Sequence, residues 1–291
     1  MKRFFIILLT IGLLAGCAST DQSGTELRNA QAAALYQTAK SALDRGDWQT
    51  ATTEYEALQA QYPFGTYATQ AQLDIIYVYY RAGDVASAVA AAERFRRINP
   101  RHQSVPYSWY MQGLALEEKN EDMLKRWVGV DTTLRDPVPR RQAFDAYTTI
   151  VERFPDSDYA GDARARLAVL FNEGARYQLS VGQFYADRQA WVAAAQRAIT
   201  VINEFAGTPS VEPAMQLLTR AYEALGLTDL AAGVVAASQA GTAAERPAGI
   251  PDMPSLYEGE TIEVPPAPQP STQAPSGPSG TTPGGGMMDN Y

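Results

Sequence analysis

The chain has 291 residues, with 24 lysine and arginine residues against 32 aspartate and glutamate residues, so its formal net charge is −8 at neutral pH. A protein this acidic lacks the basic stripe that binding to a phosphate backbone requires, and we therefore expect no nucleic-acid partner. The sequence holds one cysteine and one histidine, which excludes an internal disulfide and a site built from several His or Cys ligands.

A predicted export signal opens the chain. Met1-Lys2-Arg3 precedes an apolar run over residues 4–14. This run is much shorter than the roughly 20 residues that a membrane-spanning helix needs, and it has the layout of a secretory signal. Residues 1–16 are therefore predicted to be a signal peptide.

The cysteine that follows is predicted to carry a lipid. Leu14-Ala15-Gly16-Cys17 resembles the bacterial lipobox, in which the cysteine after the cleavage site is acylated. The alternative is a chance cysteine near a cleavage site. Each buried methylene contributes about 0.8 kcal/mol, so three acyl chains would anchor the protein almost irreversibly. Ala18 stands where an aspartate would signal retention at the inner membrane in enteric-type bacteria, so we expect residues 17–25 to be a lipidated linker at the periplasmic face of the outer membrane.

A repeated pattern occupies residues 26–118. The second copy lies 37 residues after the first, as from Gly46 to Gly83. Glycine permits a tight turn between two helices, a small alanine lets them approach closely, and proline ends the second helix. The two copies read Gly46-Asp47-Trp48, Ala51, Tyr55, Leu58, Pro63 and Gly83-Asp84-Val85, Ala88, Ala92, Phe95, Pro100. Each copy is predicted to be a helical hairpin of the tetratricopeptide type, whose usual period is about 34 residues.

Residues 119–141 form a charged stretch that we assign to an insertion between the second and third repeats, with Asp136-Pro137 as a predicted helix start. Looser copies follow over residues 142–240. The second helix of a third repeat contains Ala143, Tyr147 and Ile150 and is followed by Pro155. The second helix of a fourth repeat contains Trp191, Ala194, Ala198 and Val201, and Gln189 replaces the turn glycine before it. A fifth repeat runs from Pro213 to Ala240. The predicted fold is all-α: a superhelical stack of about five tetratricopeptide-type helix pairs with a concave groove.

The C-terminal tail, residues 241–291, holds ten of the 18 prolines and carries six acidic residues against one basic residue. Such a composition buries too little apolar surface to offset chain entropy, so we predict a disordered, Pro/Gly-rich tail. Its function stays open.

No catalytic motif stands out in the sequence. His102 has no second imidazole or thiol beside it in the sequence, and a role in a loop or helix cap is the simpler interpretation. There is no glycine-rich phosphate loop, no G-x-S-x-G and no H-E-x-x-H. We expect no enzyme activity, no cofactor and no metal. A cell-wall hydrolase remains a weak alternative.

Two groups of residues are candidates for binding. The first group comprises Tyr62-Pro63-Phe64-Gly65-Thr66-Tyr67 and residues 73–80. The helical spacing of Leu73 and Ile76 favours packing in the core. The many tyrosines, by contrast, suit a groove that recognises peptides. Tyr107, Trp109 and Tyr110 leave the same alternatives open. The second group is Tyr185-Ala186-Asp187-Arg188 with Trp191 and Arg197. Trp191 fits packing, and Arg197 fits either a partner's carboxylate or solvent.

These motifs together resemble one family. The chain is similar to the BamD family, the lipoprotein subunit of the outer-membrane β-barrel assembly machinery, and the resemblance covers nearly all of the repeat region but not the tail. The residues that carry it are Leu14-Ala15-Gly16-Cys17, Gly46-Asp47-Trp48, Tyr62-Pro63-Phe64-Gly65, Gln72 to Tyr77, Tyr79-Tyr80, Arg94-Phe95, Asn99-Pro100, Tyr110-Met111, Gly129-Val130-Asp131, Arg135-Asp136-Pro137 and Ala190-Trp191-Val192-Ala193.

The resemblance implies a non-catalytic scaffold. In that family the N-terminal repeats recognise the targeting signal of unfolded outer-membrane proteins, and the C-terminal repeats dock the periplasmic domains of the barrel-forming subunit, beside accessory lipoproteins. Carried over by position, the client-signal residues are Tyr62, Phe64, Tyr67, Asp74, Tyr77 and Arg97, and the docking residues are Arg188, Trp191 and Arg197. The alternative is a periplasmic repeat lipoprotein that recruits cell-wall enzymes, which would not need the Tyr62-Pro63-Phe64-Gly65 motif.

Overall fold

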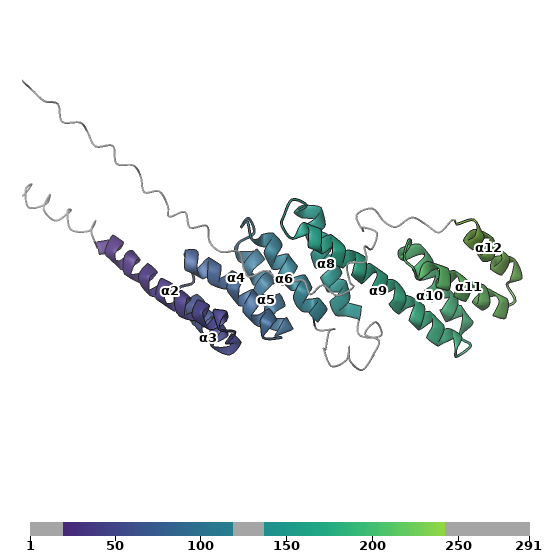
Figure 1. The fold of residues 1–291 in the computed structure, drawn as a ribbon, viewed down its shortest axis with the longest axis horizontal. Helices are drawn as coiled ribbons and strands as arrows, with labels where there is room; N and C mark the ends of the chain where they lie inside the picture. Colours follow the sequence, from purple (N-terminus) through teal and green to yellow (C-terminus); the bar gives the residue numbers. More distant parts are fainter. Residues whose placement is uncertain (1–19, 119–136, 242–291) are drawn as a thin grey trace, which may run out of the picture.

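The computed structural model describes residues 20–118 and 137–241. The predicted signal peptide, Cys17, most of the predicted insertion and nearly all of the predicted disordered tail lie outside these ranges. All the regular elements within them are α-helices (Figure 1). In chain order they are α2 (Thr20–Asp44), α3 (Trp48–Gln61), α4 (Thr66–Arg81), α5 (Val85–Ile98), α6 (Val105–Glu118), α8 (Pro137–Arg153), α9 (Ala160–Ala186), α10 (Trp191–Glu204), α11 (Val211–Ala224) and α12 (Thr228–Gln239).

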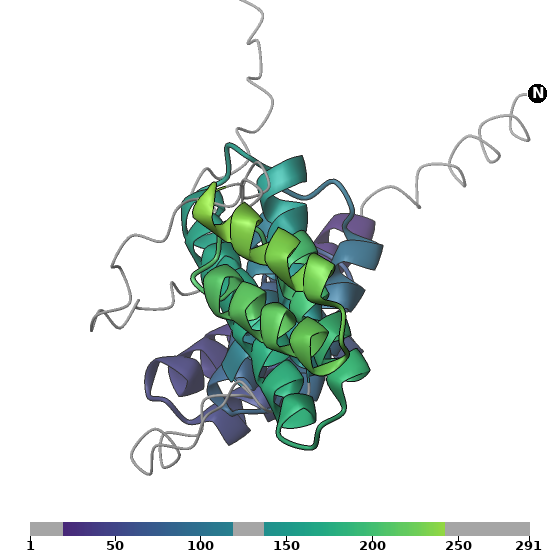
Figure 2. The same cartoon turned by 90° about the vertical axis from the view of Figure 1, so that its right-hand side faces the viewer.

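The helices pack in chain order as antiparallel pairs, and the pairs stack along an elongated body (Figure 1). The pairs are α2–α3, α4–α5, α6–α8, α9–α10 and α11–α12. The first helices of neighbouring pairs also touch, since α4 contacts both α2 and α6, and α11 contacts α9. Viewed along the stack, the later pairs lie over the earlier ones (Figure 2). The predicted all-α stack of tetratricopeptide-type helix pairs is confirmed.

Helix caps explain part of the repeated motif. The carboxylate of Asp47 accepts a hydrogen bond from the backbone N–H of Thr50 at 3.1 Å, and that of Asp84 accepts one from Ser87 at 3.0 Å. These bonds satisfy N–H groups that the first turn of a helix leaves free. The same bonds hold the pKa of both carboxyl groups below the ordinary value. The aspartate of the Gly-Asp pair therefore starts α3 and α5.

The residue before each cap makes the tight turn. Gly46 and Gly83 have φ angles of +72° and +73°, in the left-handed region that glycine enters at little cost. In the fourth repeat Gln189 takes this place with φ +59°, the one residue other than glycine with a positive φ in the described part of the chain. The proposed replacement of the turn glycine by Gln189 is thus confirmed.

The structure corrects the predicted insertion. α8 begins at Pro137, so residues 137–141 are helical, and α6 is the first helix of the third pair, so the insertion lies inside that repeat and not before it. The predicted helix start at Pro137 is confirmed, but residues 137–141 were assigned to the insertion because Arg140 occupies an inward position. Arg140 is only 6% exposed and forms an ion pair with Glu173 at 3.1 Å, which a pattern of apolar residues does not reveal.

Two apolar cores lie along the stack. The larger contains buried residues from Ala32 to Leu170, and the smaller contains buried residues from Ala186 to Ala221. The boundary between them falls inside the 27-residue helix α9, so the third repeat packs with the N-terminal repeats. None of the helices in the described ranges is long and apolar enough to cross a membrane.

Candidate functional site

The antiparallel pairing divides the loops between two edges of the stack. The loops that lead from the second helix of one pair to the first helix of the next lie along one edge, and the end of α12 lies along this same edge. The turns within pairs, including residues 187–190 and 225–227, lie along the other. Tyr62, Phe64 and Tyr67 therefore fall near the first edge, and Arg188 and Trp191 near the second.

The loop between α3 and α4 presents a single phenylalanine. Phe64 is 89% exposed, and Gly65 behind it adopts φ +103°, which brings the chain into α4 without strain. Its neighbours are held in place. The Tyr62 hydroxyl donates to Gln31 Oε1 at 2.9 Å, and the Tyr67 ring packs on Tyr36 with centroids 5.5 Å apart. The loop thus offers one free aromatic ring on a fixed support.

Arginines lie at the same edge, at the end of α5. Arg94, Arg97 and Arg101 are exposed, and Ile98 between them is 56% exposed. Arg94 donates to Gln59 Oε1 at 3.3 Å, on the helix that leads into the Phe64 loop. Within residues 20–118 and 137–241, Arg97 and Arg101 form no hydrogen bond or ion pair. We name this surface the aromatic–basic edge: Tyr62, Phe64, Tyr67, Arg94, Arg97, Ile98 and Arg101.

Asp74 is not on this surface, which corrects its assignment as a client-binding residue. It is 1% exposed. One carboxylate oxygen accepts the hydroxyls of Tyr36 and Tyr55, each at 2.9 Å, and the other accepts the Gln70 amide at 2.9 Å. Burial raises the pKa of Asp74, although these donors oppose the rise. Asp74 therefore joins α2, α3 and α4 inside the first two repeats.

Tyr77 is also an internal residue. It is 8% exposed, its hydroxyl accepts a hydrogen bond from Arg81 at 2.8 Å, and its ring lies 6.5 Å from that of Trp48. The same Arg81 guanidinium lies 4.8 Å from the Trp48 ring, in cation–π geometry. A direct contact between Tyr77 and a client is therefore corrected to a packing role.

The aromatic residues of α6 are likewise packed. Tyr107 and Tyr110 are 0% and 2% exposed, and Trp109 is half-buried. The Arg96 guanidinium lies 3.6 Å from the Trp109 ring centroid and donates to Gln112. Burial lowers the pKa of Arg96 to about 10. This arrangement fastens α5 to α6 beside the aromatic–basic edge.

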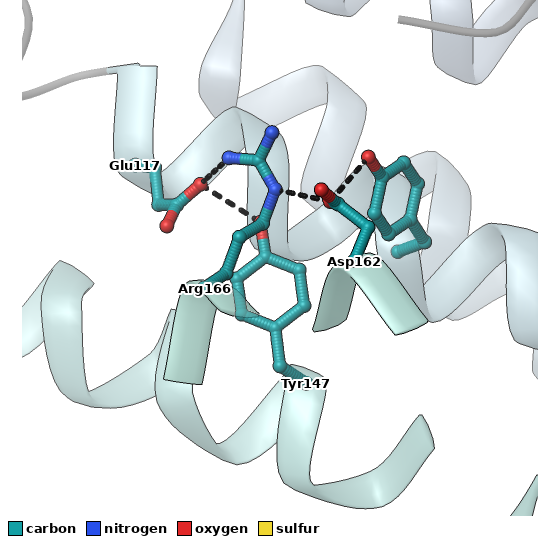
Figure 3. Close-up of polar contacts among 5 residues, drawn as sticks. Glu117, Tyr147, Asp162 and Arg166 are labelled. Atoms are coloured by element: carbon teal, nitrogen blue, oxygen red, sulfur yellow. Dashed lines mark hydrogen bonds and ion pairs between the residues drawn. The ribbon is translucent and has the colours of Figure 1, made fainter. Parts of the chain in front are cut away.

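A buried ionic cluster, which we name the Arg166 joint, fastens the third repeat to α9 (Figure 3). Arg166 donates to Glu117 on α6 and to Asp162 one turn back on α9. Tyr147 on α8 donates to the same Glu117 oxygen at 2.9 Å, and Tyr110 donates to Asp162 at 2.7 Å. Burial would lower the pKa of Arg166, but Tyr147 and the two acids raise it, so the guanidinium stays charged.

The sequence analysis did not find this joint. Asp162 and Arg166 stand four residues apart on one helix, a common surface arrangement, and Glu117 is 49 residues away from Arg166. The signal that could have marked it is Arg166 itself, which falls among Ala163, Leu167 and Leu170 at the inward spacing of α9. Only the fold shows that its side chain has acidic partners.

The second edge holds two of the predicted docking residues. Arg188 is exposed, stacks 3.4 Å from the Phe184 ring centroid and donates to the Phe184 carbonyl at 3.1 Å. Trp191 begins α10 and lines an open hollow of about 550 Å³. The other lining residues are Gln189, Ala190, Val192, Ala193, Gln196 and Leu225. Val192 is 69% exposed and Leu225 is 39% exposed, so the rim of this hollow is apolar.

The third docking residue, Arg197, lies on a different face of α10. Its guanidinium donates to Gln178 Oε1 on α9 at 2.9 Å. Its Cβ would come within 3.2 Å of a Cβ added at Gly182, so this glycine lets α9 and α10 approach closely. The structure therefore brings Arg188 and Trp191 to one edge and holds Arg197 half-buried beside α9.

His102 has the local role expected of it. Its Nδ1 atom accepts the backbone N–H of Ser104 at 3.1 Å, and its ring meets Phe95 edge-on at 5.4 Å. It therefore orders the loop between α5 and α6. Among the residues that the structure describes, no group of three or more His, Cys, Asp or Glu side chains could hold a metal ion.

Comparison with known proteins agrees with the motifs. The family YfiO, described as outer membrane lipoprotein, matches residues 28–236. The outer membrane protein assembly factor BamD of Vibrio cholerae is 37% identical over 222 residues, which cover 76% of this chain and 91% of that protein. BamD of Neisseria meningitidis is 36% identical over 232 residues, covering 78% and 87%.

Among solved structures, the chain is similar to the TPR-like repeats of a Podospora kinesin light chain, at 16% sequence identity. The match covers 72% of this chain and 93% of that chain. Its TM-score of 0.37 is too low to support an argument. The family model matches residues 28–236, and the sequence relatives are 36–37% identical over more than three quarters of this chain, which decides the family. The resemblance inferred from the motifs is confirmed, and the chain belongs to the BamD family of outer membrane lipoproteins.

Proposed function

We propose that this protein is a non-catalytic scaffold of the outer-membrane β-barrel assembly machinery. It is anchored through an acylated Cys17 at the periplasmic face of the outer membrane, and it connects unfolded barrel proteins to the barrel-forming subunit, with accessory lipoproteins beside it. Family membership and the names of the relatives support the assembly role. The two edges of the stack suit the two kinds of partner.

The client surface is the aromatic–basic edge, and the exposure of Phe64 is the observation that carries this proposal. Because the Phe64 ring is 89% exposed, it is available to bury apolar surface against a partner, and such burial favours association. Barrel strands alternate apolar and polar residues and end in aromatic belts. A signal near the end of such a chain also brings a carboxylate, which the unpaired Arg97 attracts.

A photocrosslinker tests the client surface. Placed at Phe64 in cells that export barrel proteins, it should capture unfolded outer-membrane protein. The control position is Leu230 on α12, which is 53% exposed and far along the stack. Arg97→Glu should lower capture from Phe64 several-fold, whereas Arg220→Glu, an exposed arginine on α11, should not. Equal capture from Phe64 and Leu230 would remove this assignment.

The docking surface is the second edge at α9 and α10. The hollow beside Trp191 has an apolar rim at Val192 and Leu225, and Arg188 adds a planar cation at its side. Arg197 lies deeper, where Gln178 orients a guanidinium that can still meet an acid on the barrel subunit. An interface with an apolar centre and charged surroundings is typical of stable protein complexes.

Copurification tests the docking surface. Arg197→Glu should reduce recovery of the barrel-forming subunit from detergent extracts by tenfold or more, since breaking one side of a buried charged contact costs about 2–5 kcal/mol. Val192→Glu should reduce recovery to a similar extent, because it would bury a charge without a partner at the apolar rim. Ile98→Glu is the matched control, because Ile98 is exposed on the other edge. Unchanged recovery with both docking variants would overturn this half of the proposal.

A further inference from the structure

The aromatic–basic edge carries positive charge that the described residues leave without an acidic partner. Arg97 and Arg101 make no ion pair among the described residues, although the whole chain carries a net charge of −8. On the exposed face of α5 the one acid is Glu93. Two arginines without an ion pair, on the same edge as the exposed Phe64 and Ile98, would be complemented by a segment that mixes acidic and apolar side chains.

The tail contains one such segment. Residues 256–264 read Leu256-Tyr257-Glu258-Gly259-Glu260-Thr261-Ile262-Glu263-Val264, in which three glutamates alternate with apolar or small residues and no basic residue occurs. Half of the six acidic residues of the tail are in this stretch. Glutamates on one partner and arginines on the other give charge-assisted hydrogen bonds, while Tyr257 and Ile262 can cover Phe64 and Ile98.

The placement of α12 allows the contact. α12 ends at Gln239, on the same edge of the stack as the loop that carries Phe64. The segment therefore does not have to cross the body. The roughly 15 residues from Gly241 to Leu256 span up to about 50 Å when extended. Four helix pairs lie between the Phe64 loop and the end of α12, and the nine residues of the segment extend this reach to about 80 Å at Val264.

We propose that residues 256–264 dock on the aromatic–basic edge of the same molecule. The contact is intramolecular and does not require that clients bind there. It predicts that the tail covers Phe64 when no other partner is present, and that any partner of this edge has to displace it. A second copy of the chain is the competing occupant.

The test uses the purified full chain in detergent, with a photocrosslinker at Phe64. Mass spectrometry should locate the main crosslink in residues 256–264, at a yield several-fold above that from a crosslinker at Val192 on the other edge. Replacing Glu258, Glu260 and Glu263 together by glutamine should lower the yield several-fold, whereas Glu245→Gln, elsewhere in the tail, should not. Because the glutamines keep the length and shape of the segment, a loss of yield reports charge.

A charge reversal makes the result decisive. Arg97→Glu with Arg101→Glu should lower the crosslink yield, and adding Glu258→Lys with Glu260→Lys should restore it. Crosslinks from Phe64 to the segment that are no more frequent than those from Val192 would overturn the proposal. So would a failed restoration. In an equal mixture of isotopically heavy and light chains, an intramolecular contact gives no heavy–light crosslinks, whereas heavy–light crosslinks that approach half of the total would assign the edge to a second copy and also overturn it.

Discussion

Arg166 on α9 forms a buried ion pair with Glu117 on α6, and this pair connects the third repeat to the helix that spans both cores. Their side chains are only 11% and 17% exposed. A buried pair of this kind is weak evidence for stability in itself, but removing one partner leaves an uncompensated charge. The joint therefore fastens the first turns of α9 to α6 and α8, and it makes the third repeat sensitive to single changes there.

Arg166→Met should lower the free energy of unfolding by about 3–5 kcal/mol, because Glu117 and Asp162 would stay buried without their cation. Urea titration of the full chain measures this. Arg176→Met, at an exposed arginine on the same helix, should change it by no more than about 0.5 kcal/mol. Adding Glu117→Gln to Arg166→Met should recover part of the loss. A cost below about 1 kcal/mol for the single variant would contradict the role of the joint.

Asp74→Asn should change how stability depends on pH. Burial raises the pKa of Asp74 above its ordinary 3.8, so the folded state holds this proton more tightly than the unfolded state. Its contribution is then fully present below about pH 4 and is lost as the pH rises through the raised pKa. Asparagine does not titrate. Relative to the parent, the variant should therefore gain stability between pH 4 and pH 7.5 in urea titrations; a difference that is the same at both pH values argues against a raised pKa.

Gly113→Ala should destabilise the third repeat. A Cβ at Gly113 would lie 2.5 Å from the Tyr147 ring, which is itself fully buried. Overpacking of this kind costs about 1–3 kcal/mol. Gly233 on α12 is the control, since a Cβ there meets nothing within 4 Å, and Gly233→Ala should stabilise its helix by up to about 1 kcal/mol. Thermal unfolding that moves in the same direction for both variants would disprove the close approach of α6 and α8.

Gln189→Gly should stabilise the turn between α9 and α10. Gln189 has φ +59°, and the left-handed conformation costs a residue with a Cβ about 1–2 kcal/mol. The greater freedom of unfolded glycine offsets part of this gain, so we expect about 0.5–1 kcal/mol. Gly83→Gln, at the equivalent turn with φ +73°, should cost about 1 kcal/mol by the same reasoning. Calorimetry on both variants measures the change in unfolding free energy. The change must be positive for Gln189→Gly and negative for Gly83→Gln.

The contact residues were harder to predict than the repeats. Tyr62, Phe64, Tyr67 and Tyr77 look alike in the sequence as aromatic positions around one loop and helix. The structure leaves Phe64 89% exposed and Tyr77 8% exposed, because Trp48 and Arg81 pack against Tyr77, whereas no residue of the described ranges covers the Phe64 ring. The exposure of a side chain depends on which residues of other helices pack against it, and helical periodicity in the sequence does not predict those contacts.

The sequence by itself determined the helix pairs, their turns and the family. Gly46 and Gly83 with Asp47 and Asp84 act on their own few residues, through backbone conformation and capping bonds, so their spacing is readable along the chain. Only the tertiary structure decided that Asp74 lies inside, that Arg166 meets Glu117 across 49 residues, and that the insertion divides the third repeat. These outcomes depend on which distant side chains share a buried space, since burial makes a charge costly unless a partner from another helix lies beside it.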